Sequence, residues 1–262
     1  MKAVICAAGK GARLAPLTEI APKCLLPIYN VPMIMYPLSV VKQAGIKEVC
    51  IVISAEFAHL FANLLQDGSD LGLNITFKIQ KETKGVCDAV CVAKDFVGDD
   101  NFMVLLGDNV MFDDVSQAVA KFEGGAKLFL TEVEDPRPFG VAKLDGDKLL
   151  ALVEKPETPP SNLIWTGCAI FDSQFFDFAK NIDLSPRGEY ETNDVIQQYI
   201  DQSTASYSSL RFQWFDAGTY QRLVQASQFV KTISNSLQYD RQQNPLNRIA
   251  SLRSFIEVSE SV

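Results

Sequence analysis

The chain has 262 residues, 47% of them hydrophobic and 21% charged, and its 24 basic and 32 acidic side chains give a net charge of −8. This composition is that of a globular protein and excludes a disordered chain. An acidic chain lacks the basic footprint that nucleic acids and anionic membranes need, so we expect neither as a partner, whereas a small anionic ligand remains possible at a locally basic cluster. No apolar run reaches the ~20 residues of a transmembrane helix.

The apolar residues from Val4 to Ala7 stop at Gly9-Lys10. This run is too short for the core of a secretion signal, so it predicts a first buried strand. The six cysteines are scattered and the only histidine is His59, which argues against a structural zinc site and against a catalytic triad. We interpret the cysteines as reduced thiols and predict a cytoplasmic protein.

Strands and helices alternate in the first half of the chain. The expected strands are 4–7, 48–54, 74–79 and 102–106, and the expected helices are 32–44, 57–66 and 88–96. This alternation is typical of an α/β protein with a mostly parallel sheet covered by helices. Such sheets bind ligands beyond the carboxyl ends of their strands. The residues after Ala7 and after Leu106 are therefore candidate site residues.

The order of the expected strands and helices changes after residue 112. Expected strands are 126–133, 140–144, 149–154, 164–171 and 212–215, and expected helices are 174–180, 193–202 and 220–233. No Pro/Gly/Ser-rich linker interrupts the chain, so we predict one domain over 1–235 with halves 1–112 and 113–235. The polar tail 236–262 is expected to pack as a short helix or to be mobile.

A glycine-rich segment follows the first strand. Gly9 and Gly11 allow backbone N–H groups to approach an anion, while Lys10 and Arg13 supply charge. A dinucleotide fingerprint is disfavoured because Pro16 interrupts the helix that it requires. We predict a phosphate-binding loop. Lys23, inside an apolar segment bracketed by prolines, is either a surface lysine or a lysine held over the same anion.

Two aspartates follow short apolar runs. Asp108 comes after the strand 102–106, and Asp216 follows Trp214-Phe215. One such aspartate is commonly a helix cap. Two of them on a protein with a phosphate loop suggest a shared Mg²⁺, which binds one or two carboxylates together with phosphate oxygens.

An acid–base pair, Glu154-Lys155, ends a strand just before Pro156. It is either a surface ion pair of little energetic value or part of a second subsite. In the second interpretation Lys155 binds the phosphate of a second substrate and Glu154 accepts its hydroxyl groups.

Nine segments, in this order, resemble the sugar-phosphate nucleotidylyltransferases, most closely the glucose-1-phosphate thymidylyltransferases. They are AAGKGARLAPLT, PKCLLPI, VPMIMYPLSVV, QKETKGVCDAV, FMVLLGDN, RPFGVAKLDG, LVEKP, RGEYETNDVI and WFDAGTY, within residues 1–230. The resemblance implies a Rossmann-like mixed sheet flanked by helices. It also implies an enzyme that joins a nucleoside triphosphate to a sugar 1-phosphate and releases pyrophosphate.

The resemblance assigns roles to particular residues. It implies that the catalytic residues are Arg13, Lys23, Asp108 and Lys155. It implies that the nucleotide is bound by Ala8, Gly9, Gly11, Gln80, Gly85 and Asp108, and that Gln80 and Gly85 contact a pyrimidine ring. The sugar phosphate is bound by Gly140, Glu154, Lys155 and Thr166, and Mg²⁺, the one cofactor implied, by Asp108 and Asp216. In-line attack on the α-phosphorus needs positioning and charge neutralisation rather than a protein nucleophile.

The chain departs from the family pattern at Ala12, Cys24 and Cys168-Ala169. Loss of an aromatic residue at the last pair, near the sugar pocket, is interpreted as room for a modified or bulkier sugar 1-phosphate or for another phosphorylated metabolite. Ala169→Tyr would test this hypothesis. Gln80 leaves dTTP, UTP and CTP open, with dTTP or UTP favoured. The alternatives are a cytidylyltransferase acting on another phosphorylated metabolite and a non-catalytic nucleotide-sugar-binding subunit. The resemblance implies a homo-oligomer.

Overall fold

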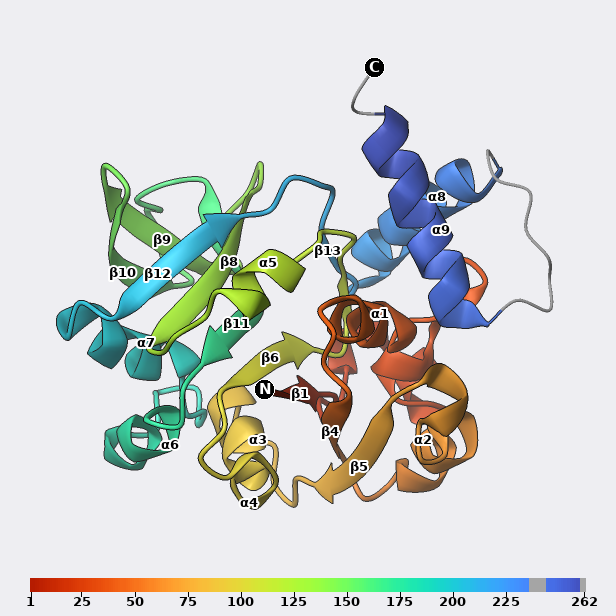
Figure 1. Ribbon diagram of the computed structural model, residues 1–262, viewed down its shortest axis with the longest axis horizontal. Helices are drawn as coiled ribbons and strands as arrows, with labels where there is room; N and C mark the ends of the chain where they lie inside the picture. Colours follow the sequence, from red (N-terminus) through yellow and green to blue (C-terminus); the bar gives the residue numbers. More distant parts are fainter. Residues whose placement is uncertain (236–243, 260–262) are drawn as a thin grey trace.

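A mixed sheet forms the centre of the molecule, here a computed structural model that describes residues 1–235 and 244–259 (Figure 1). The strand order is β10-β9-β11-β6-β1-β4-β5, and β8 and β12 extend the sheet from β11. These strands are β1 (Lys2–Cys6), β4 (Glu48–Ile53), β5 (Asn74–Ile79), β6 (Phe102–Leu106), β8 (Ala126–Glu132), β9 (Gly140–Asp145), β10 (Lys148–Glu154), β11 (Leu163–Phe171) and β12 (Ala205–Ser209).

The half of the sheet built by β1, β4, β5 and β6 is parallel, whereas β11 runs antiparallel to β6, β8 and β9. The predicted α/β class with a mixed sheet is confirmed. Helices flank the sheet: α1 (Met35–Gln43), α2 (Ala58–Leu65), α3 (Val86–Val92), α4 (Lys94–Val97), α5 (Ser116–Ala120), α6 (Phe175–Phe178), α7 (Thr192–Asp201), α8 (Tyr220–Asn235) and α9 (Pro245–Ser259). Two small pairs, β2 (Pro27–Ile28) with β3 (Val31–Pro32) and β7 (Asn109–Val110) with β13 (Phe215–Asp216), complete the fold.

Several elements differ from those expected from the sequence. The helix expected over 88–96 is two helices, α3 and α4, that meet at Ala93. The strand expected over 212–215 begins only at Phe215, because the backbone N–H groups of Arg211 and Phe212 donate to the Asp113 carboxylate instead of to a sheet ladder. Strand β12 was missed because its polar sequence, ASYSS, has no apolar alternation.

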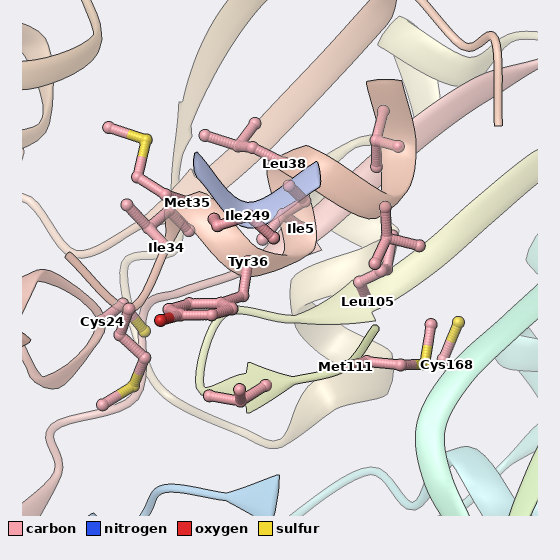
Figure 2. Packing of buried hydrophobic residues seen from close by; sticks show 14 of the residues in the cluster. Ile5, Cys24, Ile34, Met35, Tyr36, Leu38, Leu105, Met111, Cys168 and Ile249 are labelled. Carbon is pink, nitrogen blue, oxygen red and sulfur yellow. The ribbon is translucent and has the colours of Figure 1, made fainter. Parts of the chain in front are cut away.

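The core has two parts, one on each face of the sheet, because successive side chains of a strand point to opposite faces. Ile5 joins a cluster with residues of α1, α2, α8 and α9, whereas its neighbour Val4 joins a cluster with residues of α3, α4, α6 and α7. Figure 2 shows the first cluster, in which Ile5, Leu105, Tyr36 and Ile249 pack together. The strands that carry the candidate site residues are thus held from both sides.

Residues 245–259, inside the segment for which the sequence left a helix or a mobile tail open, form α9. Its start follows from local chemistry: Asn244 accepts a hydrogen bond from Leu246 N at 2.8 Å, and Pro245 needs no hydrogen-bond acceptor at the first helical position. The helix packs against α1 and α8 (Figure 1). Arg253 of α9 also donates to Gln43 of α1 at 2.7 Å.

The packing of α9 predicts a stability effect far from the candidate site. Ile249 is 1% exposed within the larger cluster. We expect Ile249→Ala to lower the free energy of unfolding by roughly 2–4 kcal/mol, the usual cost of such a cavity, as measured by urea unfolding. The exposed Ser254 on the same helix is the control, and Ser254→Ala should change little. A loss below about 0.5 kcal/mol for Ile249→Ala would mean that α9 is not docked in this way.

All six cysteines are free thiols, in agreement with the interpretation from sequence. Cys24 lies beneath Gly107, where a Cβ would come within 2.8 Å of its Sγ. Among the described residues, no helix has the length and hydrophobicity needed to cross a membrane.

Candidate active site

The candidate residues of the first half meet at one edge of the sheet. Strands β1, β4, β5 and β6 are parallel, so the segments that follow them lie at the same, carboxyl edge. Ala8 and the glycine-rich segment follow β1, Gln80 follows β5, and Asp108 follows β6. The backbone ties these ends together, since Gly107 N donates to Cys6 O at 2.9 Å and Gln80 N donates to Ile53 O at 3.0 Å.

The two glycines of the predicted phosphate loop make room for Lys23. A Cβ on Gly11 would lie 2.9 Å from the Thr18 methyl group and 3.0 Å from Lys23 Cβ, and Gly11 has a left-handed φ of 64°. A Cβ on Gly9 would touch Lys23 Cε at 3.5 Å. The glycines therefore bring the loop backbone against the lysine side chain, while Arg13 stays exposed at its rim.

Lys23 forms an ion pair with Asp108. The lysine side chain is thus mostly buried and held beside the loop by a carboxylate, so it is not a surface lysine, and its predicted place over an anion stays a prediction. Burial works against the charge of Lys23, but the nearby Asp108 outweighs it, so the pKa of Lys23 is raised and the ammonium form persists throughout the neutral range.

Asp216 lies beside Asp108 because β13 pairs with β7 in a register that sets Asp216 opposite Asn109. Ala217 N also donates to Asp108 O at 3.0 Å. Burial, followed by repulsion from Asp108, raises the pKa of Asp216, although Lys23 and Arg222 oppose the shift. Arg222 donates to Asp216 Oδ2 at 2.8 Å.

Gly218 marks the point at which these groups converge. A Cβ there would lie 2.7 Å from Asp216 Oδ1, 3.1 Å from Arg13 Nη2 and 3.5 Å from Asp108 Oδ2. Two carboxylates and a guanidinium thus face one small space that only a glycine leaves open. Carboxylate oxygens suit a hard cation such as Mg²⁺, so this donor pair fits the predicted metal site. No group of three or more His, Cys, Asp or Glu side chains that could hold a metal occurs among the described residues.

A second cluster forms where the β9–β10 hairpin brings Gly140 opposite Glu154. Glu154 accepts hydrogen bonds from Asn193 Nδ2 at 2.8 Å and from Arg187 Nη2 at 3.1 Å, and Lys155 Nζ lies 3.3 Å from its Oε1. A Cβ on Gly140 would lie 3.0 Å from Asn193 Nδ2, so a side chain at this position would crowd Asn193. Lys155 has a positive φ of 43°, a strained conformation of the kind often found at functional sites.

Burial raises the pKa of Glu154, and Glu191 and Glu189 add to the shift while Arg187 opposes it. Arg187 also lies 2.7 Å from Glu191 and 3.3 Å from Glu189. Sequence reasoning missed Arg187, Asn193, Gly218 and Arg222. Their only signal was that they lie within or next to the segments RGEYETNDVI and WFDAGTY, which the resemblance quoted without assigning them roles.

A loop contact joins the segment after β5 to the segment beside the second cluster. Tyr190 N donates to Lys84 O at 2.8 Å, and a Cβ on Gly85 would come within 2.9 Å of Tyr190 O. Gly85 also has a φ of 96°. The loop after β5 is therefore docked on the segment that carries Arg187.

Thr166 and Ala169 of β11 lie inside the protein. The Thr166 hydroxyl donates to Phe129 O at 2.8 Å and accepts from Cys168 N at 3.2 Å, so its side-chain hydrogen bonds go to the backbone. Ala169 is wholly buried in the second hydrophobic cluster. The interpretation that Ala169 opens the acceptor pocket is therefore wrong, and Ala169→Tyr would overpack the core instead of testing the acceptor.

Known proteins resemble this chain over most of its length. The nucleotidyl transferase family matches residues 2–233. A glucose-1-phosphate thymidylyltransferase of Neisseria meningitidis is 37% identical over 243 residues, which are 90% of this chain and 84% of that protein. One from Xanthomonas campestris pv. campestris is 39% identical over 240 residues, 88% and 81% of the two chains.

Solved structures show the same fold. A candidate glucose-1-phosphate thymidylyltransferase from Bacillus anthracis superimposes with a TM-score of 0.86 at 33% identity and covers 94% of this chain and 99% of its own. A UDP-glucose pyrophosphorylase complexed with UDP-glucose, with a TM-score of 0.77 at 23% identity over 88% and 98% of the two chains, shares the fold. The chain therefore belongs to the nucleotidyl transferase family, as its ordered motifs predicted.

Proposed function

We propose that the protein transfers the nucleotidyl group of dTTP or UTP to a sugar 1-phosphate, with glucose 1-phosphate as the acceptor, and releases pyrophosphate. The observation that carries the proposal is the convergence of Arg13, Lys23, Asp108 and Asp216 at the carboxyl edge of the sheet. The thymidylyltransferase names of the relatives support the substrate class.

The proposed reaction is an in-line displacement. A phosphate oxygen of the sugar 1-phosphate attacks the α-phosphorus, a new P–O bond forms, and the bond to the bridging oxygen breaks as pyrophosphate leaves with its electron pair. Arg13 and Lys23 would neutralise the triphosphate, and the backbone N–H groups at Ala8, Gly9 and Gly11 would bind its oxygens. No protein nucleophile is needed, consistent with a triphosphate loop that has no histidine.

Asp108 and Asp216 are the residues that would hold Mg²⁺. When bound there, the ion supplies positive charge to the phosphate oxygens. Burial and then the Asp108 charge raise the pKa of Asp216, and a cation between the two carboxylates would offset their repulsion.

The residues 113–235 would bind the sugar 1-phosphate and the residues 1–112 the nucleotide. Lys155 is half-exposed and can contact the sugar phosphate, whereas Glu154 can accept hydroxyl groups of the sugar. Gly140 leaves space beside Glu154, and Thr166 acts by shaping β11, since its hydroxyl is taken by the backbone.

We expect Glu154→Gln to raise KM for the sugar 1-phosphate roughly tenfold, since a carboxylate acceptor is replaced by a weaker one, with little change in KM for the nucleotide. In the native enzyme this KM should rise on acidification through a Glu154 pKa that lies above the ordinary glutamate value, because the protonated carboxyl loses its charge. Initial rates across pH measure both effects. The exposed Glu157 is the control, and Glu157→Gln should leave both KM values unchanged; equal changes in the two variants would contradict the assignment.

The test of the proposed function is pyrophosphate release with Mg²⁺ across dTTP, UTP, CTP, GTP and ATP, each with glucose 1-phosphate and other phosphorylated acceptors. Release with dTTP or UTP and glucose 1-phosphate is the expected result. Release only with CTP and another acceptor would indicate a cytidylyltransferase. No release from folded protein that still binds nucleotide would indicate a non-catalytic subunit.

We further propose a cytoplasmic homo-oligomer, on the strength of the family membership. Light scattering of the purified protein tests the oligomeric state, and a monomer would contradict the proposed homo-oligomer.

A further inference from the structure

The side chain of Gln80 is held by two acceptors. Gln80 is 6% exposed at the end of β5. Its amide nitrogen, Nε2, donates to Gly85 O at 3.2 Å and to Asp88 Oδ2, in the first turn of α3, at 2.7 Å. Both hydrogen bonds of this side chain therefore start from the nitrogen.

The partners determine which way the amide faces. A carbonyl and an ionised carboxylate only accept hydrogen bonds, so the nitrogen, and not the oxygen, must point at them. The oxygen, Oε1, is left on the other side of the amide, and no described residue donates a hydrogen bond to it. The hydrogen bond to Gly85 O, at 3.2 Å, would by itself orient the Gln80 amide only weakly. The bond to the Asp88 carboxylate is shorter and stronger.

The backbone beside Gln80 offers a hydrogen-bond donor. Gly85 N donates to no residue in the described part of the chain. An acceptor, Gln80 Oε1, and a donor, Gly85 N–H, are thus left without a hydrogen-bond partner among the described residues and are available to a ligand. The imide edge of uracil and thymine carries a donor, N3–H, next to an acceptor, O4. Cytosine carries an acceptor at N3 and an amino group in place of O4, so both of its groups would be mismatched.

We propose that Asp88 is a positioning residue that orients the Gln80 amide so that the site accepts an imide pyrimidine, uracil or thymine, and rejects cytosine. This inference rests on the proposed function, because it deals with the base of the nucleotide in that reaction. Asp88 acts through Gln80 and need not touch the nucleotide itself.

The first measurement is kcat/KM of the native enzyme for dTTP, UTP and CTP with a fixed sugar 1-phosphate. A preference for UTP over CTP of roughly a hundredfold or more is expected, because a site built to pair with one set of polar groups leaves them unpaired with the other. This comparison needs no variant. Equal use of UTP and CTP, or a preference for CTP, would overturn the proposal.

The second measurement uses Asp88→Asn. An asparagine has the same shape but offers both a donor and an acceptor, so the Gln80 amide is free to turn over. The UTP:CTP ratio of kcat/KM should fall at least tenfold, mainly through the two nucleotide KM values, while kcat with UTP changes little. Asp88→Glu retains a carboxylate and should restore part of the ratio.

Two controls separate positioning from a structural effect. Asp95, on α4, pairs with Lys78 of β5 and does not contact Gln80, so Asp95→Asn should leave the ratio unchanged. In a Gln80→Ala background, adding Asp88→Asn should cause no further change, since the residues act as one unit.

The outcomes are distinguishable from failure of the proposed function. No turnover with any nucleotide contradicts the proposed reaction itself. Turnover with UTP at a ratio that Asp88→Asn leaves intact overturns the positioning role alone. A further fall in the ratio in the Gln80→Ala background would show that Asp88 acts independently of Gln80 and would also overturn it.

Discussion

Replacement of Asp108 by alanine should reduce kcat on the order of a thousandfold, the upper range for loss of one electrostatic group in an active site. The substitution removes one of the two carboxylates that would hold Mg²⁺ and the partner of Lys23 at once. Pyrophosphate release at saturating substrates, measured over a range of Mg²⁺ concentrations, gives the effect. Turnover at a tenth of the native value or more would show that the metal assignment is wrong.

The loss of the ion pair needs its own control, because Asp108→Ala also leaves the mostly buried Lys23 ammonium without its carboxylate. Asp108→Asn keeps an oxygen that Lys23 can donate to, so it should fold more stably than Asp108→Ala yet lose similar activity. Asp99 lies in the segment before β6, at the end of the strand opposite to Asp108, and is exposed. Asp99→Ala should therefore leave kcat unchanged.

The substitution Gly218→Ala should lower kcat/KM on the order of a hundredfold, the size of effect that a misplacement of about 1 Å can cause. Its methyl group would meet Asp216 Oδ1 at 2.7 Å and Arg13 Nη2 at 3.1 Å, so these side chains must move apart. Gly218 is not among the glycines of positive φ, so alanine suits its backbone and the fold should persist. Steady-state kinetics and thermal unfolding on the same sample separate the two effects.

The control for an added methyl group is Gly146, at the tip of the β9–β10 hairpin, where a Cβ would meet no atom within 4 Å. Its φ of 55° makes alanine unfavourable there, so Gly146→Ala should lower stability by about 1 kcal/mol without changing kcat/KM. If Gly218→Ala were as active as the native enzyme, the space between the two aspartates would not be where substrate or metal binds.

The candidate site contains residues that sequence reasoning could name and residues that it could not. Asp108 was predictable because it directly follows a buried strand in a parallel sheet, whose carboxyl edge is where ligands bind. Arg187 was not, since it lies 33 residues from Glu154 in an ordinary charged segment and meets it only after folding. Asp88 was likewise an unremarked helix residue until its carboxylate was found on the Gln80 amide.

Most of the alternation of strands and helices, the sheet edge with the candidate site residues, and the family could be predicted from the sequence, because these follow from local periodicity and from motifs of contiguous residues. It misjudged Ala169, where the loss of an aromatic residue from the family pattern suggested a pocket, whereas its strand buries it completely. The folded structure was needed to show which charges pair, which atom of the Gln80 amide contacts Asp88 and why Gly218 must lack a side chain. Those properties depend on distances between segments far apart in the chain, and no local pattern encodes such distances.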